Sequence, residues 1–341
     1  MIWAEAEGCR VVDAEGRSYI DLSGGFGVAA LGHRDPEILA AVNAQAERCV
    51  HALGDLADAD VTSELRARLG GDRGEVMLGV TGEDAVEIAL RTALLVTDRP
   101  GIVAFTGAYH GTGLLALAAT GFEHFRSPFV PWLPGPVHRR PYGEDPGPLP
   151  PNTACVVVEP IQGRAGAQVP PDGFLQVLRE RCDEAGALLV ADEIYTGLGR
   201  TGALWRSGDL ADLVTCGKAL GGGLPVSACL MSAEHRAAWD LGPEDVYTHT
   251  HMGSPLAAAA ALVVLDRVPA LFDRVVEAGK RFEAAGWHGA GLLRAKEGDA
   301  FAAWERGVIV IPAGEDGRYM SATPPLTITD DEIDQALELI E

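Results

Sequence analysis

The sequence predicts an α/β protein built on a doubly wound, largely parallel sheet. Short apolar runs bounded by Gly, Pro or Asp recur along the chain, and they alternate with longer amphipathic stretches of helical period. The runs are apolar throughout, which is typical of strands buried on both faces, and strands that alternate with helices favour a parallel sheet. The predicted strands are residues 76–80, 102–105, 155–158, 187–191, 213–216 and 226–231.

Two of the intervening stretches have a clear helical stripe. Residues 83–95 place Val86, Leu90 and Leu94 on one side, and residues 174–185 repeat the pattern. We therefore expect a helix between successive strands of the sheet.

The two ends of the chain differ from this pattern. Residues 9–22 alternate around a central turn and predict a hairpin. Near the other end, Thr329 and Glu332 form a capping box that opens a final helix. The segments 128–151 and 312–325, rich in Pro and Gly, are predicted to be loops.

Composition excludes several classes of partner. The chain has 341 residues with 27 Lys and Arg against 49 Asp and Glu, a net charge of −22. This charge repels phosphate backbones and anionic lipid, so we expect neither a nucleic-acid nor a membrane partner. The length is sufficient for one large domain and a smaller one.

The cysteines, the start of the chain and the histidines predict the cellular compartment and the metal content. The six cysteines include no C-x-x-C pair, and we expect free thiols in a reducing compartment. The start of the chain lacks the pattern of a signal peptide, and the apolar run 255–265 is too short to span a bilayer. The prediction is a cytoplasmic protein. His249 and His251 lack a third ligand, so no metal is expected.

Reactive side chains follow five of the predicted strands. In open α/β sheets, ligands bind at the carboxyl ends of strands. The residues there are a Gly turn that opens a helix, an aromatic side chain, two carboxylates and a lysine. Pyridoxal phosphate needs this set: a phosphate seat, a stacking ring, a carboxylate for its ring nitrogen and an amine for a Schiff base. The residues are Thr81-Gly82-Glu83, Tyr109-His110, Glu159, Asp192 and Lys218.

Three longer motifs carry a family resemblance. The segments Glu159-Pro160-Ile161-Gln162-Gly163, Asp192-Glu193-Ile194-Tyr195 with its continuation to Gly202, and Gly217-Lys218-Ala219-Leu220 with the glycines that follow resemble the class III aminotransferases. These are pyridoxal-phosphate enzymes of fold type I, and the similarity extends over nearly the whole chain. It implies a large sheet domain at residues 41–270. It also implies a reduced small α+β domain formed by residues 1–40 and 271–341.

The resemblance also implies roles for individual residues. Lys218 would form the Schiff base, Asp192 would hold the pyridine nitrogen, and Glu159 would stand near the substrate. The enzyme would be a homodimer with composite active sites, in which Thr250 reaches the phosphate of the neighbouring subunit. The cofactor-binding set that it implies is Gly82, Glu83, Tyr109, His110, Asp192, Ile194, Tyr195, Lys218 and Thr250.

Four features depart from the family pattern. Glu83 stands where the family usually has Ser, Thr or Ala, so its carboxylate should point away from the phosphate. Tyr195 replaces a frequent Gln. Ser321 replaces an arginine that grips the substrate carboxylate in many members, and Arg318 is a candidate substitute. The stretch 288–311 is short for a full small domain, which indicates a reshaped substrate entrance.

Three functions remain open on the sequence alone. The first is an aminotransferase that moves an amino group between an amine or amino acid and a keto or aldehyde acceptor by a ping-pong mechanism. The second is an isomerase on the same scaffold, such as a racemase, epimerase or aminomutase. The third is a protein that binds the cofactor without turnover. An isomerase needs no keto acceptor, which separates the first two functions experimentally.

Overall fold

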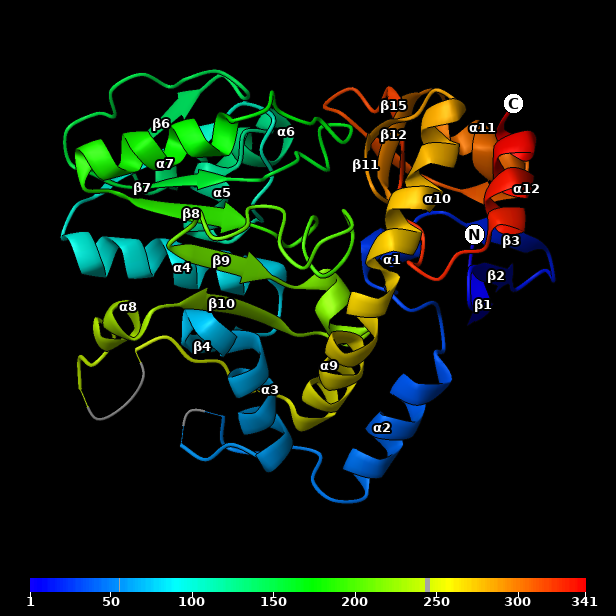
Figure 1. Ribbon diagram of the computed structural model, residues 1–341, viewed down its shortest axis with the longest axis horizontal. Helices are drawn as coiled ribbons and strands as arrows, with labels where there is room; N and C mark the ends of the chain where they lie inside the picture. Colours follow the sequence, from blue (N-terminus) through cyan, green and yellow to red (C-terminus); the bar gives the residue numbers. More distant parts are fainter. Residues whose placement is uncertain (55, 243–245) are drawn as a thin grey trace.

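The computed structural model describes residues 1–54, 56–242 and 246–341. Its largest sheet has seven strands in the order β4-β10-β9-β8-β7-β5-β6 (Figure 1). The pairs β5·β6, β5·β7, β7·β8 and β8·β9 are parallel, and β10 runs antiparallel to both β9 and β4. This confirms the predicted largely parallel sheet. The strands are β4 (Glu75–Gly79), β5 (Gly101–Phe105), β6 (Val137–Arg140), β7 (Thr153–Val158), β8 (Leu188–Asp192), β9 (Leu213–Cys216) and β10 (Ser227–Met231).

The strands are apolar throughout because each face of the sheet packs against helices. All six residues of β7 are buried. Cys155 and Val157 belong to the core formed with helix α4 (Gly82–Thr97), whereas Val156 and Val158 belong to the core formed with α7 (Phe174–Ala185). The two helices confirm the two predicted helical stripes.

The topology brings five strand ends to one edge of the sheet. β4 is antiparallel to β10, and β10 is antiparallel to β9, so β4 points in the same direction as β9. The carboxyl ends of β4, β5, β7, β8 and β9 therefore share one edge. Residues that follow these strands are brought together there although they are far apart in the sequence.

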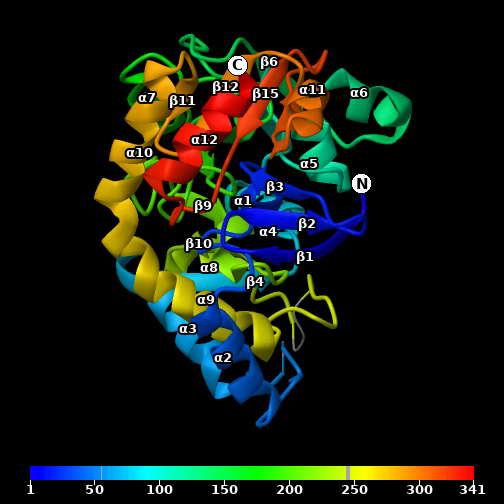
Figure 2. The same cartoon turned by 90° about the vertical axis from the view of Figure 1, so that its right-hand side faces the viewer.

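Two four-stranded sheets lie beside the large one. The N-terminal sheet has the order β1-β2-β3-β13 and the C-terminal sheet the order β11-β12-β15-β14 (Figures 1 and 2). The antiparallel pair β2·β3 confirms the predicted hairpin, and the parallel pair β3·β13 joins the two ends of the chain. The strands are β1 (Trp3–Glu7), β2 (Arg10–Asp13), β3 (Ser18–Asp21), β11 (His288–Ala290), β12 (Leu293–Glu297), β13 (Val308–Ile309), β14 (Ile311–Ala313) and β15 (Tyr319–Ala322).

The two segments predicted to be loops are partly ordered structure, which corrects that prediction. The first contains β6 and most of the 3-10 helix η2 (Ser127–Trp132), and the second contains β15 and part of β14. β6 reads Val-His-Arg-Arg and pairs only with β5, so as an edge strand it carries none of the apolar pattern of the other strands. β15 reads Tyr-Met-Ser-Ala and was hidden by the Pro and Gly residues around it.

A long helical run corrects the expectation that the apolar segment beginning at residue 255 is too short to span a bilayer. Residues 255–284 are long and apolar enough to cross a bilayer by length and composition, although core helices meet the same test. The run consists of α9 (Pro255–Arg267), the 3-10 helix η4 (Val268–Leu271) and α10 (Phe272–Ala284). α9 packs against α2 (Pro36–Ala46) and α3 (Asp60–Gly70), as Figures 1 and 2 show. Val275, Ala278 and Phe282 form the buried side of α10.

The remaining helices connect these layers. All six cysteines are free, and five of them are buried, as expected from the absence of a C-x-x-C pair. The predicted capping box is present at the start of the last helix. The connecting helices are α1 (Gly24–Gly27), η1 (Gly71–Arg73), α5 (Leu114–Ala119), α6 (Glu123–Arg126), η3 (Lys218–Gly221), α8 (Ala233–Ala237), α11 (Ala300–Glu305) and α12 (Asp330–Ile340).

Candidate active site

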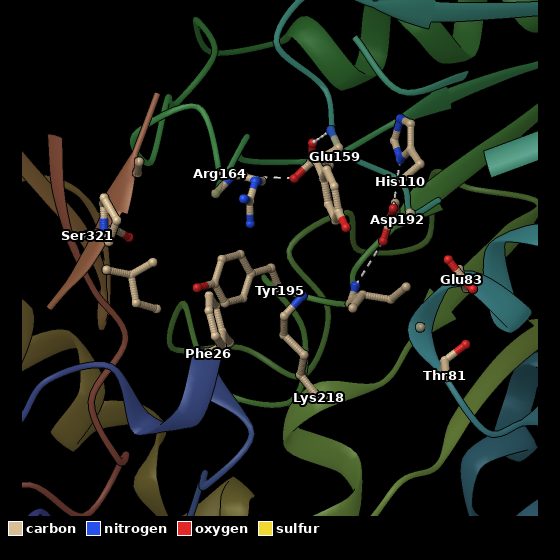
Figure 3. A pocket seen from close by; sticks show the side chains of 18 residues that line it. Phe26, Thr81, Glu83, His110, Glu159, Arg164, Asp192, Tyr195, Lys218 and Ser321 are labelled. Carbon is tan, nitrogen blue, oxygen red and sulfur yellow. Dashed lines mark hydrogen bonds and ion pairs between the residues drawn. The ribbon is translucent and has the colours of Figure 1, made fainter. Parts of the chain in front are cut away.

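A cavity of about 450 Å³ lies at the edge where the five strands end (Figure 3). Nine of the ten residues predicted for the site line this cavity. The exception is Thr250, which is exposed and lines a second cavity. The nine are Gly82, Glu83, Tyr109, His110, Glu159, Asp192, Ile194, Tyr195 and Lys218.

Lys218 is the amine of the cavity. It opens η3 two residues after β9, with a φ of 36°. Its Nζ lies 4.2 Å from the centroid of the Tyr195 ring, and it makes no hydrogen bond or ion pair with any residue that the structure describes. Burial lowers the pKa of Lys218, although the charges of Asp192 and Glu159 oppose the effect. A lowered pKa favours the neutral amine, which is the nucleophilic form.

Asp192 is the last residue of β8 and forms a buried pair with His110. Its Oδ2 lies 2.7 Å from His110 Nδ1, while its Oδ1 accepts hydrogen bonds from the Ile194 backbone N–H (3.2 Å) and the Thr215 hydroxyl (3.3 Å). Burial by itself lowers the pKa of His110, but the hydrogen bond and the charge of Asp192 outweigh it and raise that pKa. The contact with Asp192 therefore favours the protonated form of the His110 imidazole.

Glu159 directly follows β7 and is also buried. Its two carboxylate oxygens accept hydrogen bonds from the backbone N–H groups of Tyr109 (2.8 Å) and Gly163 (3.3 Å). Burial is the largest influence on this carboxyl group and raises its pKa to about 7. The His110 charge opposes this shift and the Asp192 charge adds to it. Glu159 can therefore hold or release a proton near neutral pH.

The turn after β4 forms a seat for an anion. Thr81 caps α4 through a capping box with Asp84, whose Oδ2 accepts the Thr81 backbone N–H at 2.8 Å. The N–H groups of Gly82 and Glu83 lie in the first helical turn, where no carbonyl of the helix can accept them. A Cβ on Gly82 would lie 3.0 Å from Ile194 Cδ1, so glycine permits this close approach. The positive end of the helix dipole adds to the attraction for an anion.

The Glu83 carboxylate is bound on another element, as expected from its unfavourable charge. Its Oε2 accepts hydrogen bonds from the backbone N–H groups of Thr112 (2.8 Å) and Gly113 (3.0 Å), and from the Thr112 hydroxyl (3.1 Å). These donors precede α5. Three hydrogen-bond donors thus stabilise the Glu83 carboxylate away from the helix start, and the Glu83 backbone N–H remains available to an anion.

Several further residues form the cavity wall; Ser321 was named from the sequence as the residue in place of the family's arginine, and the others were not predicted. Arg164 and Phe26 line it, together with Ile311-Pro312-Ala313 of β14 and with Ser321 of β15. Arg164 lies beyond the Glu159–Gly163 segment that follows β7, and the others follow no strand of the large sheet. A position close behind such a strand is the signal that located the other residues. Arg318, the suggested substitute for an arginine at position 321, does not line the cavity. It is exposed, lies 3.8 Å from Asp316 and stacks on Tyr319, because it precedes β15 on the outside of the sheet.

The donor set of the cavity fits pyridoxal phosphate. It offers an unpaired lysine amine, a buried carboxylate and unpaired N–H groups at a helix start. The Ile194 side chain, which packs close to Gly82, adds an apolar wall. Together with the largely parallel seven-stranded sheet, these features define a pyridoxal-phosphate-dependent transferase of fold type I.

Comparisons with known proteins agree with this class. The sequence model of the family "Aminotransferase class-III" matches residues 1–285, and the chain belongs to this family. The acetylornithine aminotransferase of Methanopyrus kandleri is 39% identical over 81% of this chain and 72% of its own length. That of Corynebacterium efficiens is 37% identical over 98% of this chain and 90% of its own.

Solved structures give the same result. The ornithine aminotransferase of Toxoplasma gondii superposes with a TM-score of 0.91 at 30% identity, covering 99% of this chain and 89% of the other. An amine transaminase from an uncultivated Pseudomonas species, solved with pyridoxal phosphate bound, also reaches 0.91, at 25% identity over 100% and 93%. The protein is therefore a pyridoxal-phosphate-dependent aminotransferase, and the isomerase alternative is not favoured.

Proposed function

We propose that this cavity transfers an amino group between an amine or amino acid and a keto or aldehyde acceptor by a ping-pong mechanism. Lys218, Asp192 and Glu159 are its catalytic residues in this proposal. The observation that carries it is the placement of an unpaired lysine amine in one cavity with two buried carboxylates, all at neighbouring strand ends.

The proposal assigns the cofactor to named residues. When bound, pyridoxal phosphate supplies a reactive aldehyde and a ring that withdraws electrons from the substrate carbon. Gly82 and Glu83 would hold its phosphate through their backbone N–H groups, and Asp192 would hold its ring nitrogen. Tyr109 and Ile194 would cover the two ring faces. His110 and Tyr195 would complete the set, His110 through its 2.7 Å contact with Asp192.

Lys218 would also move the proton. A neutral Nζ can accept a proton from the carbon that carries the amino group and return it later. The lowered pKa of Lys218 supports this role because it increases the neutral fraction near physiological pH. His110 would hold Asp192 in place through its 2.7 Å contact in a buried position.

The proposal also covers the substrate class, the cellular compartment and the division into domains. The relatives are named for acetylornithine, which supports amino acids among the substrates. The six free cysteines support a reducing compartment, and we place the enzyme in the cytoplasm on that ground. The proposed division into a large domain at 41–270 and a small one at 1–40 and 271–341 is supported by the separate sheets in each part.

We further propose a homodimer whose sites are completed by the neighbouring subunit. Thr250 is exposed and lines a cavity of about 860 Å³ that also touches Thr81 and Glu83 of the phosphate turn. Leu53 also lines this cavity and is 62% exposed. An exposed apolar side chain beside the phosphate turn supports a covering partner.

Replacement of the lysine tests the proposed chemistry. Lys218→Ala should abolish the visible absorbance of the lysine-linked cofactor and all amino-group transfer. Lys280→Ala is the matched control, because Lys280 is exposed on α10 and pairs only with Glu277. An unchanged visible spectrum in Lys218→Ala would overturn the proposal.

A further inference from the structure

Arg164 is a cation in the cavity that the catalytic roles above do not use. It follows the Glu159–Gly163 segment, and its side chain is half-buried. The guanidinium carbon lies 5.0 Å from the centroid of the Tyr109 ring and 4.9 Å from that of Phe125. Two aromatic rings therefore restrict the position of this side chain.

The Arg164 guanidinium has no anionic partner among the residues that the structure describes. No carboxylate of residues 1–54, 56–242 or 246–341 lies within ion-pair distance of it, and no hydrogen bond from its side chain is recorded there. Two other partly buried arginines do have carboxylate partners: Arg179 has Asp212 at 2.6 Å, and Arg267 has Asp35 at 2.7 Å. An oriented guanidinium without a partner is suited to bind a carboxylate from solution.

Ser321 supplies a second unpaired group. Its Oγ is buried and has no hydrogen-bond partner among the described residues, although it lies in the wall of the same cavity. β15 holds Ser321 between Ala295 of β12 and Ile311 of β14. The Arg164 loop is attached to this sheet by the Gly314 backbone N–H, which donates to the Arg164 carbonyl oxygen at 2.8 Å.

The two groups lie away from the phosphate seat. In Figure 3, Ser321 lies to the left of Tyr195 and Arg164 lies above it, whereas Thr81 and Glu83 lie to the right, beyond Lys218. A phosphate bound at the start of α4 would therefore not neutralise Arg164. Glu159 forms no ion pair with Arg164 either, and its carboxylate oxygens accept backbone N–H groups of Tyr109 and Gly163.

We propose that Arg164 is the specificity-determining residue that binds a carboxylate of the amino-acid or keto-acid substrate, with the Ser321 hydroxyl as a second donor. This inference rests on the proposed function and specifies its substrate class. It assigns the carboxylate to the loop after β7, whereas the resemblance suggested an arginine at position 321. An arginine on that loop approaches the substrate from the side of Tyr109 and Phe125.

A binding experiment with an unreactive carboxylate tests the inference. The holoenzyme is titrated with succinate, which has neither an amino nor a keto group, and the dissociation constant is measured by calorimetry. Arg164→Gln should weaken succinate binding roughly 10- to 100-fold, the range for loss of charge-assisted hydrogen bonds. Arg164→Lys should recover part of the loss, and Ser321→Ala should weaken binding by roughly threefold. Arg318→Gln is the control and should change nothing.

Two outcomes would overturn the inference: equal succinate affinity in Arg164→Gln and the parent enzyme, or no binding to the parent enzyme at 100 mM succinate, a concentration about a hundredfold above a millimolar Kd. The visible absorbance of the lysine-linked cofactor shows that each variant is folded and loaded. Loss of that absorbance in the parent enzyme would instead contradict the proposed function. These two failures are therefore distinguishable.

A matched pair of donors extends the test to turnover. Alanine and ethylamine differ by one carboxylate. Arg164→Gln should lower kcat/KM for alanine roughly 10- to 100-fold while ethylamine changes less than about threefold. Equal losses for both donors would assign Arg164 a structural role and overturn the inference.

Discussion

At the residue scale, Glu159 shows how the cavity sets the charge of a side chain. The carboxyl group is buried, the Asp192 carboxylate is close enough to disfavour its charge, and the His110 ring opposes that effect. Two backbone N–H groups support the ionised form, yet burial is the larger influence. The result is a carboxyl group with a pKa of about 7, in reach of the reacting groups.

This shift predicts a pH-dependent stability for the apoenzyme. The pKa of Glu159 rises from 4.5 to about 7 on folding. Its contribution to the free energy of unfolding is therefore fully present below pH 4.5 and is lost as the pH rises through 7. Glu159→Gln removes this pH-dependent loss of stability, because glutamine does not titrate. The free energy of unfolding of the variant, relative to the parent, should rise by roughly 2 to 3 kcal/mol between pH 5 and pH 8. Urea denaturation at the two pH values measures it.

The control for this experiment is Glu180→Gln, which changes an exposed carboxylate on α7. Surface substitutions of this kind usually change stability by less than about 0.5 kcal/mol. A difference between Glu159→Gln and the parent that stays constant from pH 5 to pH 8 would contradict the prediction. Asp192, His110 and Lys218 line the same cavity as Glu159, so all three are kept unchanged in both variants.

At the element scale, strands of the large sheet were predictable because both of their faces are buried. Their apolar runs mark them, and the positions after them, together with the family resemblance, located nine residues of the cavity. β6 and β15 were missed because one is a polar edge strand and the other lies in a small sheet with mixed residues. Arg164 and Phe26 were missed for a related reason: each lies on a loop or distorted turn without periodicity, and only the tertiary fold brings it to the cavity.

The final helix gives a prediction at this scale. Thr329 caps α12: its hydroxyl accepts the Glu332 backbone N–H at 3.2 Å, and Glu332 Oε2 accepts the Thr329 backbone N–H at 3.0 Å. Thr329→Ala removes the hydroxyl and should cost about 1 kcal/mol of stability. Thr329→Ser keeps it and should recover most of the loss. Thermal unfolding of both variants measures the effect, and equal losses would show that the hydroxyl does not matter.

At the scale of the whole molecule, the cavity is lined by residues inside and outside the segment that the family model matches. The family match ends at residue 285, and the cofactor-facing residues lie within it. Ser321 and the residues 311–313 lie beyond it, in the small C-terminal sheet. The sequence predicted the first group well because it follows family motifs on strand ends. In the substrate-facing wall, the family pattern pointed only to Ser321, so the rest of its composition required the structure.

The proposed homodimer makes the last prediction. If Thr250 serves the neighbouring subunit, Thr250→Asp places a carboxylate beside the partner's cofactor phosphate, and the repulsion should weaken cofactor binding roughly tenfold or more.

Lys218→Ala subunits have no Schiff-base lysine but an intact Thr250. The two variants are dissociated, mixed and reassembled at a cofactor concentration too low to load the Thr250→Asp sites, and each mixed dimer then contains one site with both Lys218 and Thr250. Activity should therefore return on mixing, at up to about a quarter of the parent level, because random pairing makes half of the dimers mixed. Mixing Thr250→Asp with Lys280→Ala subunits is the control for reassembly. If each subunit used its own Thr250, no mixed dimer would contain an intact site, and the absence of recovery would contradict the composite arrangement.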